Sequence, residues 1–461
     1  MSARAVAEPR PEATAANLSL GSTAALLFAA RSVQYLVFGI TGILLARGLG
    51  PDGRGVYGLI NETAIIASSF PGMGLEMAGI YLFGQSRFRL QTVFSNSFSW
   101  TVCLSVIWMA LIGVAIVTDE NILGMETLDL CIALAGACLI MITDGAGEYL
   151  LPLGRVRAYT SLKIIVPVVR LAGILVMALA VGLSVEVAAA IWLGSFAVGA
   201  VITVFFLLRH VRVLPGINMA ALKQQASFGV RGHFGWVLQA LNHRLDVFLV
   251  GYFVGTAGVG HYLVGVNLAE LGWWIPITLG TVLFPKVAAM QSKDNFELSA
   301  AACRRTLAVT GAAMIGLLIL ARPMIPIVYG TEFGPSVSVF LILLPSGLFY
   351  TLHKVLGSSL SANGMPQVTV FSGLASLPVT IGLNLVLVPA WGIQGAAVAS
   401  DVAYAINAAV VLGFFLKVSK LPLRDVLFFN GEDISAFRWT VRDLWTNYVR
   451  RNAAYQPTVS E

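Results

Sequence analysis

Residues 44–59, LLARGLGPDGRGVYGL, contain the glycine pattern from which the fold can be inferred. Inside it, Gly48, Gly50 and Gly53 form a G-x-G-x-x-G pattern, the glycine spacing that holds a dinucleotide pyrophosphate between a strand and a helix. Here the glycines follow an apolar segment, residues 20–47, that is long enough to cross a bilayer as a helix. The pattern therefore predicts a turn at the end of a spanning helix and no nucleotide site.

The composition is that of an integral membrane protein. Hydrophobic residues make up 57% of the 461-residue chain and charged residues only 11%, whereas soluble proteins carry about 25% charged residues. The net charge of +6 does not indicate nucleic acid as a partner. In a membrane protein the charges can be interpreted only after each is assigned to one side of the bilayer.

Twelve apolar segments come near the length of about 20 residues that a spanning helix needs, and they predict an all-α membrane fold. Short polar breaks separate them. The segments cover residues 20–47, 54–83, 92–118, 128–153, 160–182, 187–209, 223–250, 257–286, 304–328, 335–362, 367–389 and 394–417.

The distribution of basic residues orients these segments. Arginine and lysine gather on alternate connections, and acidic residues dominate the others, so the positive-inside rule places both termini in the cytoplasm. The first nineteen residues read as a disordered tail. Residues 433–451 repeat apolar side chains at helical spacing between arginines, which predicts an amphipathic helix on the inner leaflet, or one docked on the protein's own cytoplasmic face.

The later part of the opening stretch recurs about 205 residues downstream. GPDGRGVY at residues 50–57 returns as GTAGVGHY at 255–262, and both copies fall in an outward-facing turn between the first and second helices of a half. The conserved spacing matches Gly50, Gly53, Gly55 and Tyr57 with Gly255, Gly258, Gly260 and Tyr262.

This repeat predicts two parallel six-helix lobes, residues 20–214 and 215–420, around a central cavity. The tails would be residues 1–19 and 421–461. Rocking of the lobes would open the cavity to one side of the membrane at a time. The architecture favours a transporter.

Three stretches carry a resemblance to a known family. LARGLGPDGRGVYGL, RLDVFLVGYFVGTAGVGHYLVG at residues 244–265 and LGRVRAY before the fifth segment resemble the polysaccharide-transport (Wzx-like) branch of the multidrug/oligosaccharidyl-lipid/polysaccharide exporter superfamily. The resemblance implies a flippase in the bacterial inner membrane that moves an undecaprenyl-pyrophosphate-linked oligosaccharide, for O-antigen, capsule or exopolysaccharide assembly. Its implied partners are membrane lipids, a polysaccharide polymerase and glycosyltransferases. No final hydrophobic pair, as in fourteen-helix members, follows Lys417, which weakens an assignment to the lipid II flippase branch.

Basic residues inside the spans support an anionic substrate, because a charge in hydrocarbon normally faces a wet cavity or a partner. A pyrophosphate needs cations, and arginine binds phosphate oxygens in pairs. The candidates for the cavity are Arg31, Arg170, Arg231 and Lys354, with Gln34 and Tyr35 continuing the face of Arg31. For Arg31 and Arg170 the alternative is an interhelical ion pair with Glu62, Asp144 or Glu148, and for Lys354 it is contact with the membrane surface.

Helical geometry separates the charges of the seventh segment. Arg231, Asn242 and Asp246 share one sector at 100° per residue, and Arg244 lies opposite. We expect Arg231 to face the cavity and the residues near the outer end to form a lock between conformations. The candidates for ion coupling or gating are Glu62, Asp144, Glu148, Arg244, Asp246 and Glu270.

Asp144 and Glu148 are one helical turn apart, so they either share a proton or pair with Lys163 or Arg170. The chain has no Gly-Lys pair and hence no P-loop for ATP, so export would use a proton or sodium gradient, or would run downhill as the product is consumed in the periplasm. We expect no cofactor, no metal site and no catalytic residue.

Two other classes are considered. A membrane-embedded polymerase or ligase would carry a large periplasmic loop, and the outward connections here are short. A cation-coupled multidrug exporter would favour an acidic aromatic cavity, whereas this chain places basic side chains in its spans.

Overall fold

Helices account for almost all regular structure in the computed structural model, which describes residues 20–69, 72–118, 125–211, 213, 216–290, 294–429 and 433. Apolar segments fold this way because a helix satisfies its backbone N–H and C=O groups internally, as hydrocarbon requires. The helices of the first half are α1 (Leu20–Ser69), α2 (Leu75–Gly84), α3 (Leu90–Thr118), α4 (Thr127–Ile140), the π turn η1 (Met141–Gly145), the 3₁₀ turn η2 (Ala146–Leu150), α5 (Val156–Ala180) and α6 (Val185–His210).

The second half repeats this pattern of long helices interrupted by short turns. Its elements are α7 (Met219–Val254), α8 (Thr256–Glu270), η3 (Leu271–Trp273), α9 (Trp274–Ala289), α10 (Asp294–Tyr329), η4 (Thr331–Phe333), α11 (Ser336–Leu343), α12 (Ser346–Ala362), α13 (Gln367–Trp391), α14 (Ile393–Ser419) and α15 (Leu423–Leu427).

The predicted all-α membrane fold is confirmed. Each of the twelve predicted segments falls on one helix, on part of one, or on a run of successive helices. Among the described residues, nine helices are long and apolar enough to cross a membrane, or ten if the bent pair α11 and α12 is one span. The number is lower than twelve because α1 holds two predicted segments in one run, and the charged helix α7 is not among the nine.

Glycine makes the break inside α1. Gly50 has φ 68° and ψ −177°, a conformation that glycine adopts without a steric penalty, and Pro51 starts the next helical stretch. Gly255, its counterpart in the repeat, has φ 92° and ψ 179° between α7 and α8. The two copies of the repeated stretch therefore turn the chain with the same backbone conformation.

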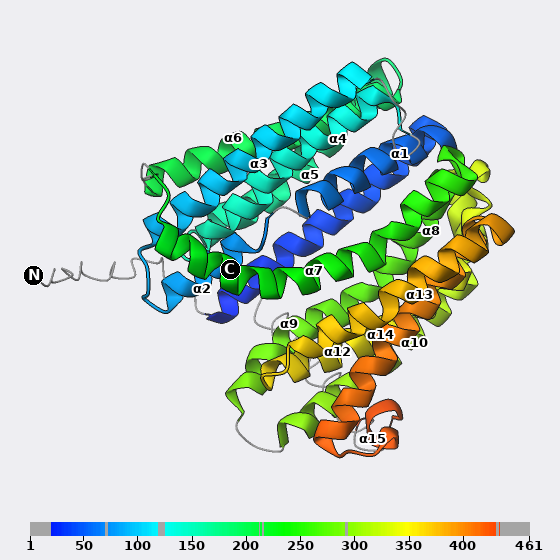
Figure 1. Cartoon of the computed structure of the whole chain (residues 1–461). Helices are drawn as coiled ribbons and strands as arrows, with labels where there is room; N and C mark the ends of the chain where they lie inside the picture. Colours follow the sequence, from blue (N-terminus) through cyan, green and yellow to red (C-terminus); the bar gives the residue numbers. More distant parts are fainter. Residues whose placement is uncertain are drawn as a thin grey trace, which may run out of the picture. The chain divides into compact units, whose positions relative to one another are not determined.

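The chain forms two compact units. The first comprises the described residues of Met1–Val266, Ala321–Ile342 and Leu377–Ser400. In it α3, α4, α5 and α6 lie side by side, with α1 against α4 and α5 (Figure 1). The first turns of α7 are bound to α2 and α3, where the fully buried Gln225 side chain donates to the carbonyl oxygens of Leu75 (3.3 Å) and Val93 (3.1 Å).

The second unit comprises the described residues of Asn267–Leu320, Leu343–Ser376 and Asp401–Glu461. Its α9 and α12 pack along one another (Figure 1). Val426 of α15 is fully buried in the same hydrophobic cluster as Cys303 of α10 and Phe415 of α14. The two six-helix lobes with a boundary at residues 214 and 215 stay a prediction, because the units above divide α10, α13 and α14.

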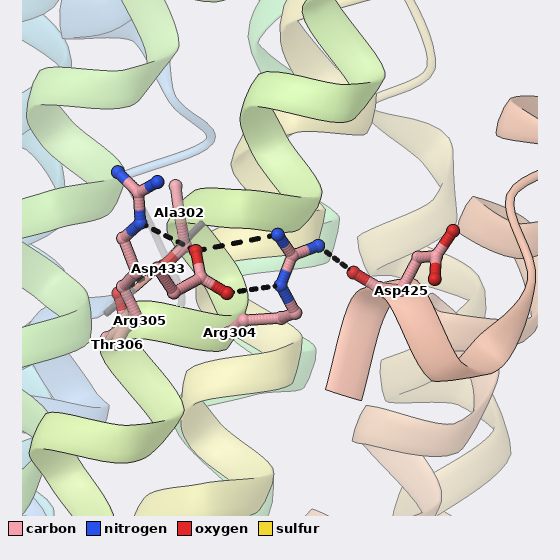
Figure 2. Close-up of polar contacts among 6 residues, drawn as sticks. All are labelled: Ala302, Arg304, Arg305, Thr306, Asp425 and Asp433. Atoms are coloured by element: carbon pink, nitrogen blue, oxygen red, sulfur yellow. Dashed lines mark hydrogen bonds and ion pairs between the residues drawn. The ribbon is translucent and has the colours of Figure 1, made fainter. Parts of the chain in front are cut away.

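A buried carboxylate fixes the chain after the last long helix. Asp433 is fully buried and accepts from Arg304 Nε at 2.9 Å and from Arg305 Nε at 2.8 Å, while Arg304 Nη1 also donates to the main-chain oxygen of Asp425 (Figure 2). The remainder of the predicted amphipathic helix, like the predicted N-terminal tail, lies outside the described residues.

Candidate functional site

Charged side chains inside the spans of the first unit gather around a break in a helix. After Ile140 the α-helical pattern of α4 changes to the π turn η1 and then to the 3₁₀ turn η2. Such π turns occur frequently at functional sites. Asp144 lies on η1 and Glu148 on η2, so the break carries both carboxylates singled out in the sequence.

The two carboxylates have separate partners. Asp144 Oδ1 lies 2.8 Å from Lys163 Nζ of α5, with the Asp144 side chain 51% exposed. Glu148 Oε1 accepts a 3.0 Å hydrogen bond from the Tyr159 hydroxyl, and Lys163 Nζ lies 5.3 Å from the centre of the Tyr159 ring. The alternatives for Asp144 and Glu148 were a shared proton or pairing with Lys163 or Arg170. In the structure Asp144 pairs with Lys163.

Arg31 of α1 is exposed and lies close enough to Tyr159 to act on it electrostatically. Tyr35 is also exposed, and Gln34 is half-buried. The exposed cation on α1 and the partly exposed Asp144–Lys163 ion pair between η1 and α5 therefore lie near one another within mainly apolar spans.

Arg170 of α5 sits in an aromatic enclosure. Arg170 is 6% exposed. Its guanidinium carbon lies 5.0 Å from the ring centre of Phe196 and 5.9 Å from the ring centres of Phe38 and Trp192. Its Nε donates a hydrogen bond to Ser195 Oγ at 3.4 Å. No ion pair of Arg170 with a carboxylate occurs in the described part of the chain. Cation–π contacts, worth about 2 kcal/mol or more in desolvated sites, hold the charge, and its Nη2 has no hydrogen-bond partner there.

The faces of α7 bind different helices. Arg244 Nε lies 3.2 Å from Glu62 Oε2 on α1. On the other side, Asp246 Oδ2 accepts from the hydroxyls of Tyr262 (2.5 Å) and Ser400 (2.6 Å). The α7 backbone at Arg231 is described, but the placement of its side chain is not, so the role of Arg231 stays a prediction.

Removing the partners of the Glu62–Arg244 ion pair tests whether it holds α1 to α7. We expect Glu62→Gln and Arg244→Met each to lower the free energy of unfolding, because each leaves a largely buried polar group without its charge partner. In a double-mutant cycle in detergent, the coupling energy should be about 1–3 kcal/mol. Additive single effects would show that the pair contributes no stability.

Two further candidates belong to the second unit. Glu270 ends α8 immediately before an aromatic cluster, in which the ring of Trp273 stacks on Tyr350 at 4.3 Å between centres and meets the edge of Tyr404 at 5.3 Å. Lys354 is half-buried on α12 beside Gly280 of α9. The cavity roles of these residues remain predictions.

Sequence reasoning missed Glu76, a further carboxylate at the same break. Glu76 lies in the first turn of α2, and its Oε1 would be 3.2 Å from a Cβ atom on Gly145 of η1. A carboxylate within the predicted segment 54–83 was the available signal. Among the described residues no group of three His, Cys, Asp or Glu side chains could hold a metal ion.

The fold and its charged spans define a multi-pass membrane protein. Residues 44–338 match the family described as "Polysaccharide biosynthesis protein", so the chain belongs to that family. The family membership predicted from the sequence motifs is confirmed.

Curated relatives are named as flippases or as a lipopolysaccharide biosynthesis protein. The chain is 28% identical over 198 residues to the probable flippase AglR of Haloferax volcanii, which covers 41% of the chain and 40% of AglR. It is 25% identical over 167 residues to the probable low-salt glycan biosynthesis flippase Agl15 of the same organism (35% of each) and 24% identical over 165 residues to WzxC of Escherichia coli (34% of the chain, 32% of WzxC). The matched regions span about a third to two fifths of these relatives.

Solved structures share the fold over most of the chain. The lipid II flippase MurJ in an inward closed conformation superposes with a TM-score of 0.71 at 15% identity, covering 87% of this chain and 89% of MurJ. A multidrug resistance transporter of the MATE family gives 0.68 at 14% identity, covering 86% and 98%. At such identities the likeness concerns the fold alone.

Proposed function

We propose that this protein is a flippase that moves a lipid-pyrophosphate-linked oligosaccharide across the membrane by alternating access. The observation that carries the proposal is the match of residues 44–338 to the polysaccharide biosynthesis family in a chain with a multi-pass helical fold. The flippase names of AglR and Agl15 support the same activity.

The polar neighbourhood of η1 supports an anionic headgroup. Arg31 is exposed, and Lys163 is partly exposed, within apolar helices. Cations in such places are costly unless they face water, a partner or an anionic ligand. We propose that Arg31, Arg170, Arg231 and Lys354 contribute to binding the pyrophosphate and that Gln34 and Tyr35 contact the glycan.

Energy coupling would use the carboxylates. We propose Glu62, Asp144, Glu148, Asp246 and Glu270 as candidates for proton or sodium coupling or for gating with Arg244. Downhill movement drawn by consumption of the glycan on the far side would need no coupling ion.

We propose that the protein lies in the bacterial inner membrane, as the family resemblance implies, and that both termini are cytoplasmic, on the distribution of its basic residues. A polymerase and glycosyltransferases of the same pathway would be its functional partners. The proposal is transport rather than catalysis. The multidrug exporters share the fold, but the basic residues in the spans of this chain favour an anionic substrate over cationic drugs.

Translocation by the purified protein tests the proposal directly. In proteoliposomes that contain a fluorescent undecaprenyl-pyrophosphate oligosaccharide, we expect protein-dependent transfer between leaflets, measured by protection from a membrane-impermeant quencher. Wild-type protein that is folded but transfers no more lipid than empty vesicles would contradict the proposed function.

Arg31→Ala and Arg231→Ala are expected to lower the rate of this transfer about tenfold or more, because a hydrogen bond between charged groups contributes about 1.5–3 kcal/mol. Arg89→Ala, which removes an exposed arginine from the connection before α3, is the control and should leave the rate unchanged. If all three variants transfer lipid at the wild-type rate, the cations on α1 and α7 do not bind the headgroup.

A further inference from the structure

The two copies of the repeated glycine stretch cross each other with their backbones in contact. A Cβ atom on Gly55 would lie 1.8 Å from the main-chain oxygen of Thr256, the first residue of α8. A Cβ atom on Gly260 of α8 would lie 1.9 Å from the main-chain oxygen of Pro51, which starts the second part of α1. Each glycine thus faces the first residue of the opposite helix, and any side chain there would force the helices apart.

The contact has a local two-fold symmetry that follows the sequence repeat. Gly55 and Gly260 occupy the same place in the repeat, as do Pro51 and Thr256. The remaining glycine pair makes the turn tight: a Cβ on Gly53 would lie 3.0 Å from Leu49 Cβ, and one on Gly258 would lie 2.9 Å from Val254 Cβ. The repeated glycines therefore have separate tasks, first the turn and then the crossing.

The crossing lies about one helical turn from the ends of its helices, next to contacts that can be broken. The Thr256 hydroxyl donates to the Asp52 carboxylate, both near the turn. Arg47 donates from Nε to the main-chain oxygen of Val328 at 2.8 Å and from Nη2 to that of Ile327. Contacts between Cα–H groups and carbonyl oxygens contribute only about 0.5–1 kcal/mol each, so a crossing built on glycine can separate at modest cost.

We propose that this crossing is a separable gate: the first helical turns after Gly50 and Gly255 close one end of the transport path and part in every cycle. The inference rests on the proposed flippase function, in which the two repeats rock against each other. Contacts at helix ends separate most in such a motion, and at Gly55 and Gly260 the contact is made by backbone rather than by side chains.

A disulfide across the gate tests whether it must open. In a variant without the four native cysteines, Asp52→Cys and Thr256→Cys replace the hydrogen-bonded pair. The matched control is Ser299→Cys with Ser359→Cys, whose hydroxyls lie 2.7 Å apart on α10 and α12 of the second repeat. We expect oxidation to abolish lipid transfer by the first pair and dithiothreitol to restore it, while the oxidised control retains transfer. Undiminished transfer by the oxidised Asp52/Thr256 pair would overturn the proposal.

A second measurement needs no substrate and separates this inference from the proposed function. Pulsed electron paramagnetic resonance between spin labels at positions 52 and 256 should give two distance populations in lipid bilayers, one short and one longer. A single short distance under all conditions, including during transport by the protein without a disulfide, would overturn the proposed gate. Two populations in a protein that transfers no lipid-linked oligosaccharide would support the gate and count against the proposed function.

Discussion

Replacing Asp433 with alanine is expected to lower the free energy of unfolding by about 3–5 kcal/mol, the usual cost of removing one partner from a buried ion pair. Asp433 is fully buried, and Arg304, which is 7% exposed, would lose the carboxylate that both arginines share (Figure 2). Denaturant or detergent unfolding of the purified protein measures the effect.

The control for this experiment is Asp425→Ala. Arg304 contacts the main-chain oxygen of Asp425, which the substitution retains, so we expect a change below about 1 kcal/mol. Arg305→Ala should fall between the two variants, since the Arg305 side chain is 47% exposed and water screens its pair with Asp433. Equal stability of Asp433→Ala and Asp425→Ala would show that the carboxylate shared by Arg304 and Arg305 contributes no stability.

Gly55→Val and Gly260→Val form the second large expected effect. Each substitution places side-chain atoms where a Cβ alone would already lie 1.8 Å or 1.9 Å from a carbonyl oxygen. Overpacking of this kind costs about 1–3 kcal/mol, and the local two-fold symmetry predicts losses of similar size for the two variants. Unfolding in detergent and the distance between spin labels at positions 52 and 256 would report the loss and the separation.

Gly42→Ala is the matched control on the same helix, because a Cβ atom at Gly42 would meet nothing within 4 Å. We expect stability equal to or up to about 1 kcal/mol above that of the unsubstituted protein, since alanine favours the helix over glycine. A loss with Gly42→Ala as large as that with Gly55→Val would show that glycine in α1 acts through helix flexibility and not through the crossing.

Much of the fold could be predicted from the sequence because the bilayer acts on local properties. The apolar length of each segment and the spacing of its polar breaks predicted the helices, and the recurrence of glycines predicted equivalent turns at Gly50 and Gly255. The sequence also singled out Asp144 and Glu148, because a carboxylate in an apolar run is conspicuous.

Side-chain partners could not be predicted in the same way. Glu62 was one of three carboxylates proposed as alternative partners of Arg170, yet Arg170 lies among aromatic rings and Glu62 pairs with Arg244. Such choices depend on which faces of distant helices meet, and the hydrophobic pattern of one helix does not specify the rotation of its neighbour. Glu76 was passed over for the same reason, since its position beside Gly145 arises only when α2 packs against η1.

Hydropathy, charge and glycine spacing act within a few turns of the chain, so the amino-acid sequence was enough to identify a membrane protein with a repeated arrangement of helices. The roles of the repeated glycines became visible in the folded chain. Gly50 and Gly255 set the turn, whereas Gly55 and Gly260 bring two backbones together across some 200 residues of sequence. That contact depends on the absence of a side chain at the point where the helices cross. The sequence of one helix does not specify which other helix will pack against it there.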